Sequence, residues 1–299
     1  MKITKKLFAL ALAMVFILAA CGGADNSSNT GTDNSQEGST GASGLINVVS
    51  REDGSGTRGA FVEIVGVVDE NDEDATSLEA DIQNGTGKVI AAVAGDDRAI
   101  GYISLGSLND DVKAIKVDGV EATEENVLSG EYKIQRPLLF VYKSEAELSD
   151  VAKDYLAFAL SKEGQDIAID HGYVTSNPDA QPFIAQENLS GTISVTGSTS
   201  VGPLATSLAE AYKELNPNVN IEIQETGSGA GIKEAMDGVN DIGMSSRELK
   251  EDETLAESVI AKDGIAVIVS PENPTDNLTL EQIKEIYLGN IVNWDELAQ

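Results

Sequence analysis

The stretch TGSTS at residues 196–200 lies between an apolar run that ends at Val195 and a helical pattern that begins at Pro203. Two further stretches occupy the same kind of position. SREDGSGT at 50–57 follows an apolar run that ends at Val49, and TGSGAG at 226–231 follows one that ends at Gln224. Each stretch therefore links a predicted strand to a predicted helix, and together they favour an α/β fold.

Small hydroxyl residues and glycines at the start of a helix have a specific chemical use. The first N–H groups of a helix have no partner within it, and the helix dipole is positive at that end. Glycine lets the backbone approach a ligand, and serine or threonine adds a hydroxyl donor, which together make an anion site. Any one of these stretches alone is better explained as a plain helix cap or a glycine-rich turn. Three of them in one chain, one with an arginine whose fork of donors suits an oxyanion, predict a shared small anion.

Alternating apolar strands and amphipathic helices fill the rest of the chain. The hydrophobic pattern predicts strands at 45–49, 100–103, 112–117, 138–142, 192–195, 219–224, 242–244 and 265–269. It predicts helices at 59–65, 89–94, 148–170, 203–215, 231–236 and 280–287, with Thr279 as an N-cap. Residues 175–188 contain two prolines and are predicted to be a linker.

The N-terminal residues predict an exported, anchored protein. Three lysines precede an apolar run over Leu7–Ala20 that is too short to span a bilayer comfortably, so residues 1–20 are predicted to be a signal peptide. The run ends in LAAC, which resembles a lipobox, and the sole cysteine, Cys21, is the expected site of lipid attachment, palmitate included. An ordinary signal peptide with an incidental cysteine is the alternative. Residues 21–44 are polar and predicted to be a flexible linker.

Charge and composition exclude several functions. The net charge of -30 argues against nucleic acid or an anionic membrane surface as a partner. A local site of oriented donors is still compatible with an anionic ligand. The single histidine, His171, the single cysteine and the absence of a P-loop leave no pattern for a metal cluster or an activated nucleophile, so no enzyme and no cofactor is expected.

Over nearly all of residues 45–299 the chain resembles the substrate-binding protein of the bacterial high-affinity phosphate ABC transporter. SREDGSGTRGAF at 50–61 resembles the arginine loop of that family. TGSTS at 196–200 and ETGSGAGI at 225–232 resemble its two phosphate loops, and LTLEQI at 278–283 and IVNW at 291–294 are also similar. The resemblance implies a type II periplasmic-binding-protein fold, in which two α/β lobes close on the anion at a hinge.

Carried over position by position, the resemblance implies the site residues. The expected phosphate contacts are Arg51, Ser55, Gly56, Thr57, Thr199, Ser200, Ser228 and Ser246. Two residues are expected in support. Asp53 is well placed to hold the Arg51 guanidinium, or else caps the following turn. Arg247 either adds positive potential or is a surface residue.

The order of the two halves departs from the family pattern. In the family the TGSTS loop precedes the arginine loop, whereas here it follows, so the chain is predicted to be circularly permuted. The rejoined lobes would be 45–137 plus 264–299, carrying the arginine loop, and 138–263, carrying the other two loops. Residues 175–189 would join the old termini, and such changes at exposed loops are often tolerated. A rearranged or truncated reading frame is the alternative.

Ser246 is the second departure, because the well-known members have an aspartate there that accepts the proton of hydrogen phosphate. That aspartate excludes fully ionised sulfate, because two acceptors would face each other with no proton between them. A serine at 246 need not repel sulfate, so the resemblance does not imply this way of selecting phosphate over sulfate.

The resemblance implies capture of phosphate and its delivery to the permease and ATPase subunits of an importer by a monomer anchored outside the cell membrane. A phosphate-responsive surface sensor or adhesin, or a binder of another oxyanion, is the alternative.

Overall fold

A computed structural model describes residues 42–186 and 188–297. The predicted signal peptide at 1–20 and Cys21 lie outside the described residues, as does the linker predicted at 21–44 apart from its last three residues. No helix in the described ranges is both long and apolar enough to cross a membrane.

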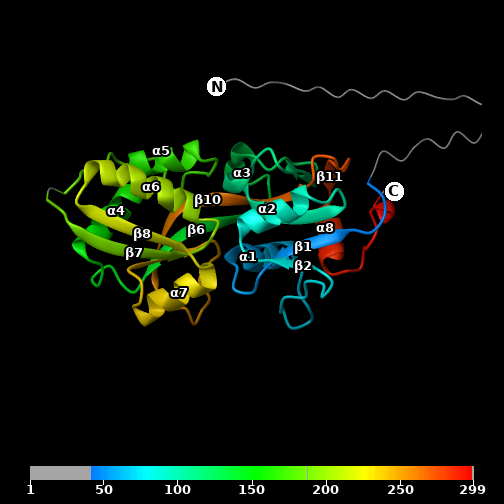
Figure 1. Ribbon diagram of the computed structural model, residues 1–299, viewed down its shortest axis with the longest axis horizontal. Helices are drawn as coiled ribbons and strands as arrows, with labels where there is room; N and C mark the ends of the chain where they lie inside the picture. Colours follow the sequence, from blue (N-terminus) through cyan, green and yellow to red (C-terminus); the bar gives the residue numbers. More distant parts are fainter. Residues whose placement is uncertain (1–41, 187, 298–299) are drawn as a thin grey trace, which may run out of the picture. The chain divides into compact units, whose positions relative to one another are not determined.

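A mixed sheet runs through the described residues, with helices on its two faces (Figure 1). The strand order is β2-β1-β3-β10-β6-β9-β7-β8, with β4 paired to the edge of β10. The long strand β10 (Ala256–Val269) is antiparallel to β6 (Gln135–Tyr142) in its first half and to β3 (Ala99–Ser104) in its second. One strand therefore joins two groups of elements, and the α/β fold class is confirmed.

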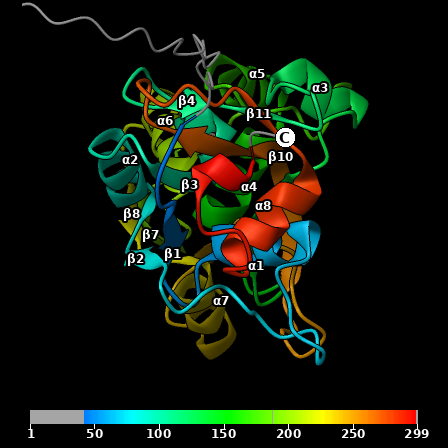
Figure 2. The same cartoon turned by 90° about the vertical axis from the view of Figure 1, so that its right-hand side faces the viewer.

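The first group of elements surrounds β1 and β3. Besides β3 it comprises β1 (Asn47–Arg51), α1 (Gly56–Val65), β2 (Asp81–Gln83), α2 (Thr86–Ala94), η1 (Leu105–Ser107), β4 (Lys113–Ala114), β5 (Lys116–Val117), α3 (Glu124–Ser129), β11 (Asn277–Leu278), α8 (Leu280–Tyr287) and η2 (Trp294–Glu296). Helices α1 and α8 lie side by side although they are far apart in sequence (Figure 2). We call this group the β1–β3 side.

The second group surrounds β6 to β9. Besides β6 it comprises α4 (Asp150–Leu160), α5 (Lys162–Asp170), β7 (Gly191–Gly197), α6 (Gly202–Leu215), β8 (Val219–Glu225), α7 (Ser228–Asp237) and β9 (Ile242–Ser245). Its parallel strands β8, β7 and β9 are neighbours in the sheet. We call this group the β7–β9 side.

Each side buries its own hydrophobic core. The β1–β3 side draws its core side chains from 42–134, 174 and 265–297, and the β7–β9 side draws its from 138–261. Along β6, Leu138 and Phe140 pack on one face against α4 and α6, and Leu139 and Val141 pack on the other against α7. This alternation is the two-residue period of a strand that is covered on both faces.

The two ends of the described chain lie against each other. The N–H of Ile46 donates to the carbonyl of Val292 at 2.8 Å, and Leu45 pairs with Asn293 in an antiparallel bridge. Trp294 is 2% exposed, lies in the core of the β1–β3 side and donates from its indole N–H to the carbonyl of Arg98. The C-terminal segment therefore packs beside the start of β1.

The prediction of a single long helix over 148–170 is wrong, because the helix is interrupted at Ser161. The backbone of Ser161 is extended, and its hydroxyl donates to the carbonyl of Phe158 and accepts from the N–H of Gly164. A Cβ on Gly164 would lie 2.3 Å from the Phe158 carbonyl oxygen, so the tight start of α5 needs glycine. The apolar periodicity continues through the break and conceals it.

Two strand predictions also need correction. The predicted strand at 112–117 divides at Ile115, where β4 pairs with β10 and β5 pairs with β11. The strand predicted at 265–269 begins nine residues earlier, because β10 carries charged residues such as Lys262 and Asp263 that hide its apolar pattern. Short elements without a clear period, α3, β2 and β11, were not predicted.

Helix α8 begins with the predicted cap. The Thr279 hydroxyl accepts from the N–H of Gln282 at 3.1 Å, and the Gln282 side chain accepts from the N–H of Thr279 at 2.8 Å. We expect Thr279→Ala to lower the free energy of unfolding by about 1 kcal/mol, because the Thr279 hydroxyl is the N-cap acceptor for the backbone N–H of Gln282. Urea denaturation measures the loss, and Thr275→Ala, outside any helix, is the control. Equal stability of the two variants would contradict the assignment.

Candidate anion-binding site

The three stretches predicted from the sequence meet at the junction of the two sides. The N–H of Gly229, in the first turn of α7, donates to the carbonyl of Gly54 at 2.9 Å. Gly56 is the first residue of α1, and a Cβ there would lie 2.3 Å from the Ser228 hydroxyl and 2.7 Å from that of Ser246. The start of α1 thus touches the start of α7, and only glycine permits this approach.

Arg51 contributes a buried cation to this junction. Its side chain, at the end of β1, is 2% exposed. Its Nη2 donates to the Thr199 hydroxyl at 3.0 Å, and its Nη1 donates to the Thr86 hydroxyl at 3.4 Å. These two hydroxyls are 3.1 Å apart, although Thr86 starts α2 on the β1–β3 side and Thr199 precedes α6 on the other. The guanidinium therefore reaches across the junction.

The acidic partner of Arg51 is Glu52, so of the two roles expected for Asp53 the structure favours the cap of the following turn. Glu52 accepts from Nε of Arg51 at 2.8 Å and from Nη2 at 2.7 Å, in a two-point pair. It also accepts from the N–H of Gly85. Asp53 is exposed and accepts from the N–H of Gly54, so it caps the turn. The longer Glu side chain reaches both donors of the fork, which is the favoured geometry for arginine and carboxylate.

Further serine and threonine hydroxyls from both sides contact one another at the junction. The Thr57 hydroxyl lies 2.9 Å from that of Ser200. The Ser198 hydroxyl donates to that of Ser246 at 2.9 Å, and Ser228 lies 3.3 Å from Ser246 and accepts from its N–H at 3.2 Å. We call the following residues the hydroxyl cluster: Thr57, Thr86, Ser198, Thr199, Ser200, Ser228 and Ser246. Of the described carboxylates, only that of Glu52 hydrogen-bonds to Arg51, and none bonds to a side chain of the cluster.

Two members of the hydroxyl cluster were missed in the sequence. Ser198 lies inside the quoted TGSTS stretch, and only its neighbours were selected. Thr86 belongs to another glycine-flanked start of a helix, because Gly85 caps α2 and Gly87 follows. A search for every Gly–Thr or Gly–Ser pair before a predicted helix would have found both. Ser55 lies near the cluster, but its hydroxyl caps its own helix: it accepts from the N–H of Arg58 in the first turn of α1.

Arg247 follows the cluster residue Ser246 in the sequence, but its guanidinium is paired elsewhere. Its guanidinium pairs with Glu253 through two hydrogen bonds, of 2.8 and 2.6 Å, and its side chain is 15% exposed. The hydrogen bond from Arg247 is the main cause that lowers the pKa of Glu253. Of the two roles expected for Arg247, positive potential at the site is not favoured, because its charge is neutralised by Glu253.

Glu52 sets a pH dependence for this junction. Burial alone would raise its pKa, but the hydrogen bonds and charge of Arg51 outweigh burial and lower the pKa below its ordinary value of 4.5. A lowered pKa in the folded protein stabilises it above the ordinary pKa, and this contribution is lost as the pH falls through the lowered value. We expect Glu52→Gln to unfold more easily than wild type at pH 7 and equally easily near pH 2. Urea denaturation across this pH range measures the difference, and a constant difference would contradict the ion pair.

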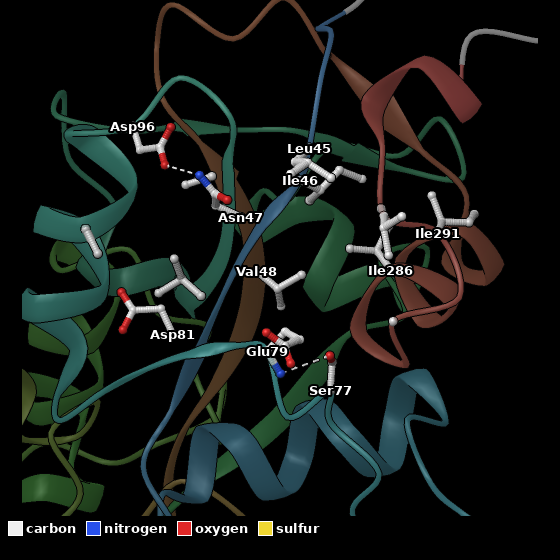
Figure 3. A pocket seen from close by; sticks show the side chains of 15 residues that line it. Leu45, Ile46, Asn47, Val48, Ser77, Glu79, Asp81, Asp96, Ile286 and Ile291 are labelled. Carbon is white, nitrogen blue, oxygen red and sulfur yellow. Dashed lines mark hydrogen bonds between the residues drawn. The ribbon is translucent and has the colours of Figure 1, made fainter.

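A cavity of about 550 Å³ lies elsewhere on the β1–β3 side (Figure 3). Ile286 and Ile291 line one part of it, and Val48 of β1 projects into its middle. The side chains of Asp81 and Asp96 line the opposite part. This acidic lining is unsuited to an anion, in contrast to the hydroxyl cluster. The described residues also hold no group of three or more His, Cys, Asp and Glu side chains that suits a metal ion.

Comparison with known proteins shows the family of the chain. Residues 24–163 and 185–299 match the family model described as a PBP superfamily domain. The phosphate-binding protein PstS 2 of Streptococcus pneumoniae is 42% identical, over 99% of this chain and all of that protein. The chain belongs to the phosphate-binding protein PstS family. Its type II periplasmic-binding-protein fold is thereby established.

Two further members support the assignment to the PstS family. PstS 2 of Streptococcus agalactiae is 42% identical over 89% of this chain and 92% of that protein. The crystal structure of the phosphate-binding protein of a Streptococcus pneumoniae phosphate ABC transporter is 44% identical, with a TM-score of 0.69 over 85% of this chain and all of that one. The match to the pneumococcal PstS 2 runs from end to end, so that protein has its segments in the same order as this chain. The order of the segments is therefore not the result of a reading-frame rearrangement that is unique to this chain.

Proposed function

We propose that the protein captures inorganic phosphate between its two sides and delivers it to an ABC phosphate importer. The observation that carries the proposal is the buried Arg51 guanidinium, which reaches across the junction to Thr199 among hydroxyls at four helix N-termini. The names of the PstS relatives add support, since they are phosphate-binding proteins. The protein acts as a substrate-binding protein rather than as an enzyme.

The proposed site residues are Arg51 with the hydroxyl cluster, together with the backbone of Ser55 and Gly56. A phosphate among them would replace hydroxyl–hydroxyl contacts such as that between Thr57 and Ser200. Each hydrogen bond to the charged anion contributes roughly 1.5–3 kcal/mol. Because donors come from both sides, the anion stabilises the closed arrangement over an open one, and the permease would recognise the closed form.

The two sides are proposed to act as lobes, 45–137 plus 264–299 and 138–263. The separate hydrophobic cores support this division. Their borders lie within β6 and β10, which makes these two strands the proposed hinge. The circular permutation also stays a proposal. The packing of Ile46 against Val292 supports it, since these ends would be continuous in the unpermuted order. The match to PstS of Bacillus subtilis, over only 41% of this chain, is consistent with it.

An extracellular position and a lipid anchor on Cys21 are proposed from the N-terminal sequence. Labelling of cells with a palmitate analogue tests the anchor: the label should enter the wild-type protein and not the Cys21→Ser variant. Release of both proteins into the medium, unlabelled, would contradict it.

Ser246 keeps a second ligand class open, because none of the carboxylates in the part of the chain that the structure describes bonds to the side chains of the hydroxyl cluster. Without an acceptor that requires a proton on the anion, sulfate is the competitor to test. Tight binding of phosphate with weak binding of sulfate supports the proposed function. Equal binding of both would reassign the protein to a broader group of oxyanions.

Uptake of labelled phosphate by cells separates import from sensing. Cells whose only copy carries Arg51→Ala should take up phosphate slowly at low concentration, and the wild-type copy should restore uptake. Normal uptake with the Arg51→Ala protein, at equal protein levels, would contradict delivery to an importer and favour a sensor or adhesin.

A further inference from the structure

A buried ion pair lies behind the hydroxyl cluster. Arg136 of β6 and Asp263 of β10 are register partners in neighbouring strands, and their side chains are 1% and 0% exposed. Nε and Nη2 of Arg136 donate to one Asp263 oxygen at 3.1 and 3.0 Å. A buried ion pair rarely stabilises a fold more than apolar residues would, so its presence calls for another explanation.

The two members of this pair also bind one group from each side. The other oxygen of Asp263 accepts from the N–H of Leu105, whose side chain packs against the core of the β1–β3 side. Nη1 of Arg136 donates to the carbonyl of Ser246 at 3.0 Å. Ser246 follows β9, whose Ile242 lies in the core of the β7–β9 side. A continuous chain of hydrogen bonds therefore runs from one side to the site residue of the other.

Each polar group of Ser246 makes a hydrogen bond. Its carbonyl accepts from Arg136, its N–H donates to the Ser228 hydroxyl, and its own hydroxyl accepts from that of Ser198. Without Arg136, the buried Ser246 carbonyl would lose its charged donor. The loop would then change conformation to give this carbonyl another hydrogen-bond donor. The direction of the Ser246 hydroxyl thus depends on a residue that lies behind the cluster.

We propose that Arg136 is a positioning residue for anion binding. While paired with Asp263, Arg136 holds the loop at Ser246 through the Ser246 carbonyl, and this contact orients the Ser246 hydroxyl toward the anion. The proposal rests on the proposed function. A parallel contact supports it, because the buried hydroxyl of Tyr173 donates to the carbonyl of Ser200 at 3.0 Å. Two of the loops on the β7–β9 side are thus held from behind by buried donors.

A double-mutant cycle on phosphate affinity tests the proposal. Arg136→Lys keeps a charge beside Asp263 but cannot reproduce the fork that also reaches Ser246. We expect it to weaken phosphate binding about tenfold in the wild-type background, and less than about twofold in a Ser246→Ala background, since residues that act together are not additive. Equal losses in the two backgrounds would overturn the proposal, because they would indicate a general effect on folding or charge.

Further variants cover the remaining outcomes. If Arg136→Lys does not fold, the double variant Arg136→Gln with Asp263→Asn replaces it, because it removes both charges together. Its loss of phosphate affinity should also be larger in the wild-type background than in the Ser246→Ala background. Tyr212→Phe is the control, since it removes a buried hydrogen bond to Asp154 in the core of the β7–β9 side. It should lower Tm and leave affinity unchanged.

Arg51→Ala separates this proposal from the proposed function. If Arg51→Ala abolishes binding and Ser246→Ala has no effect, phosphate binding stands and the role of Arg136 through Ser246 is overturned. If Arg51→Ala has no effect, the proposed site itself fails.

Discussion

Replacement of Arg51 by alanine is expected to weaken phosphate binding by at least about a hundredfold, because charge-assisted hydrogen bonds contribute roughly 1.5–3 kcal/mol each and the fork supplies two. The guanidinium is 2% exposed, so its charge acts on the anion in surroundings that screen it less than bulk water does. The variant also leaves the carboxylate of Glu52 without its partner and close to the anion. Calorimetric titration of the folded variant measures the loss.

Two matched variants sharpen this test. Arg51→Lys keeps the charge and loses the fork, so an intermediate affinity is expected. Arg98→Ala removes an arginine of which about half is exposed, 51%, and which faces Asp96 away from the cluster. It should bind phosphate as wild type does. If Arg51→Ala and Arg98→Ala bind phosphate equally well, Arg51 does not contact the anion.

Replacement of Gly56 by alanine is expected to separate stability from binding. Gly56 lies in the first turn of α1, and the residues that its added Cβ would meet, Ser228 and Ser246, belong to the other side. Separation of the two sides therefore relieves the clash without unfolding, and the free energy of unfolding should change little. The new Cβ would lie 2.3 Å from the Ser228 hydroxyl and keep α1 away from α7. Phosphate, which needs donors from both sides, should then bind at least about tenfold more weakly, the loss expected when one charge-assisted hydrogen bond is broken.

Gly87→Ala is the control for this substitution. Gly87 occupies the first turn of α2 beside the cluster residue Thr86, and a Cβ there meets no atom within 4 Å. Its affinity for phosphate should therefore equal that of wild type. An unchanged affinity of Gly56→Ala, measured by the same titration, would show that the two sides need not approach as closely as they do here.

The sequence was sufficient to predict the elements that carry the site. Each of the three proposed anion loops combines a strand end, a glycine and a helix start within a few residues, so local chemistry specifies it. Thr196–Ser200 and Ser228 lie together because the parallel strands β7 and β8 end at the same edge. Arg51 ends β1, which runs in the opposite direction on the other side, and it meets Thr199 across the junction. The resemblance to phosphate-binding proteins added the pairing of loops from different halves, which no local pattern could supply.

Features that depend on contacts distant in sequence were not predictable in this way. The choice of Glu52 over Asp53 as the partner of Arg51 depends on which side chain reaches the fork. Asp263 lay outside the predicted strand at 265–269, because its pairing with Arg136, more than a hundred residues away, cannot be seen in the local pattern. The break at Ser161 depends on the close contact of Gly164 with Phe158. Tertiary packing decides each of these.

Calorimetric titration of the purified protein with inorganic phosphate tests the central claim most directly. The account predicts saturable binding of one phosphate per chain, which disappears in the Arg51→Ala variant. A protein that unfolds cooperatively on heating, and is therefore folded, but releases or absorbs no heat on addition of phosphate would contradict it.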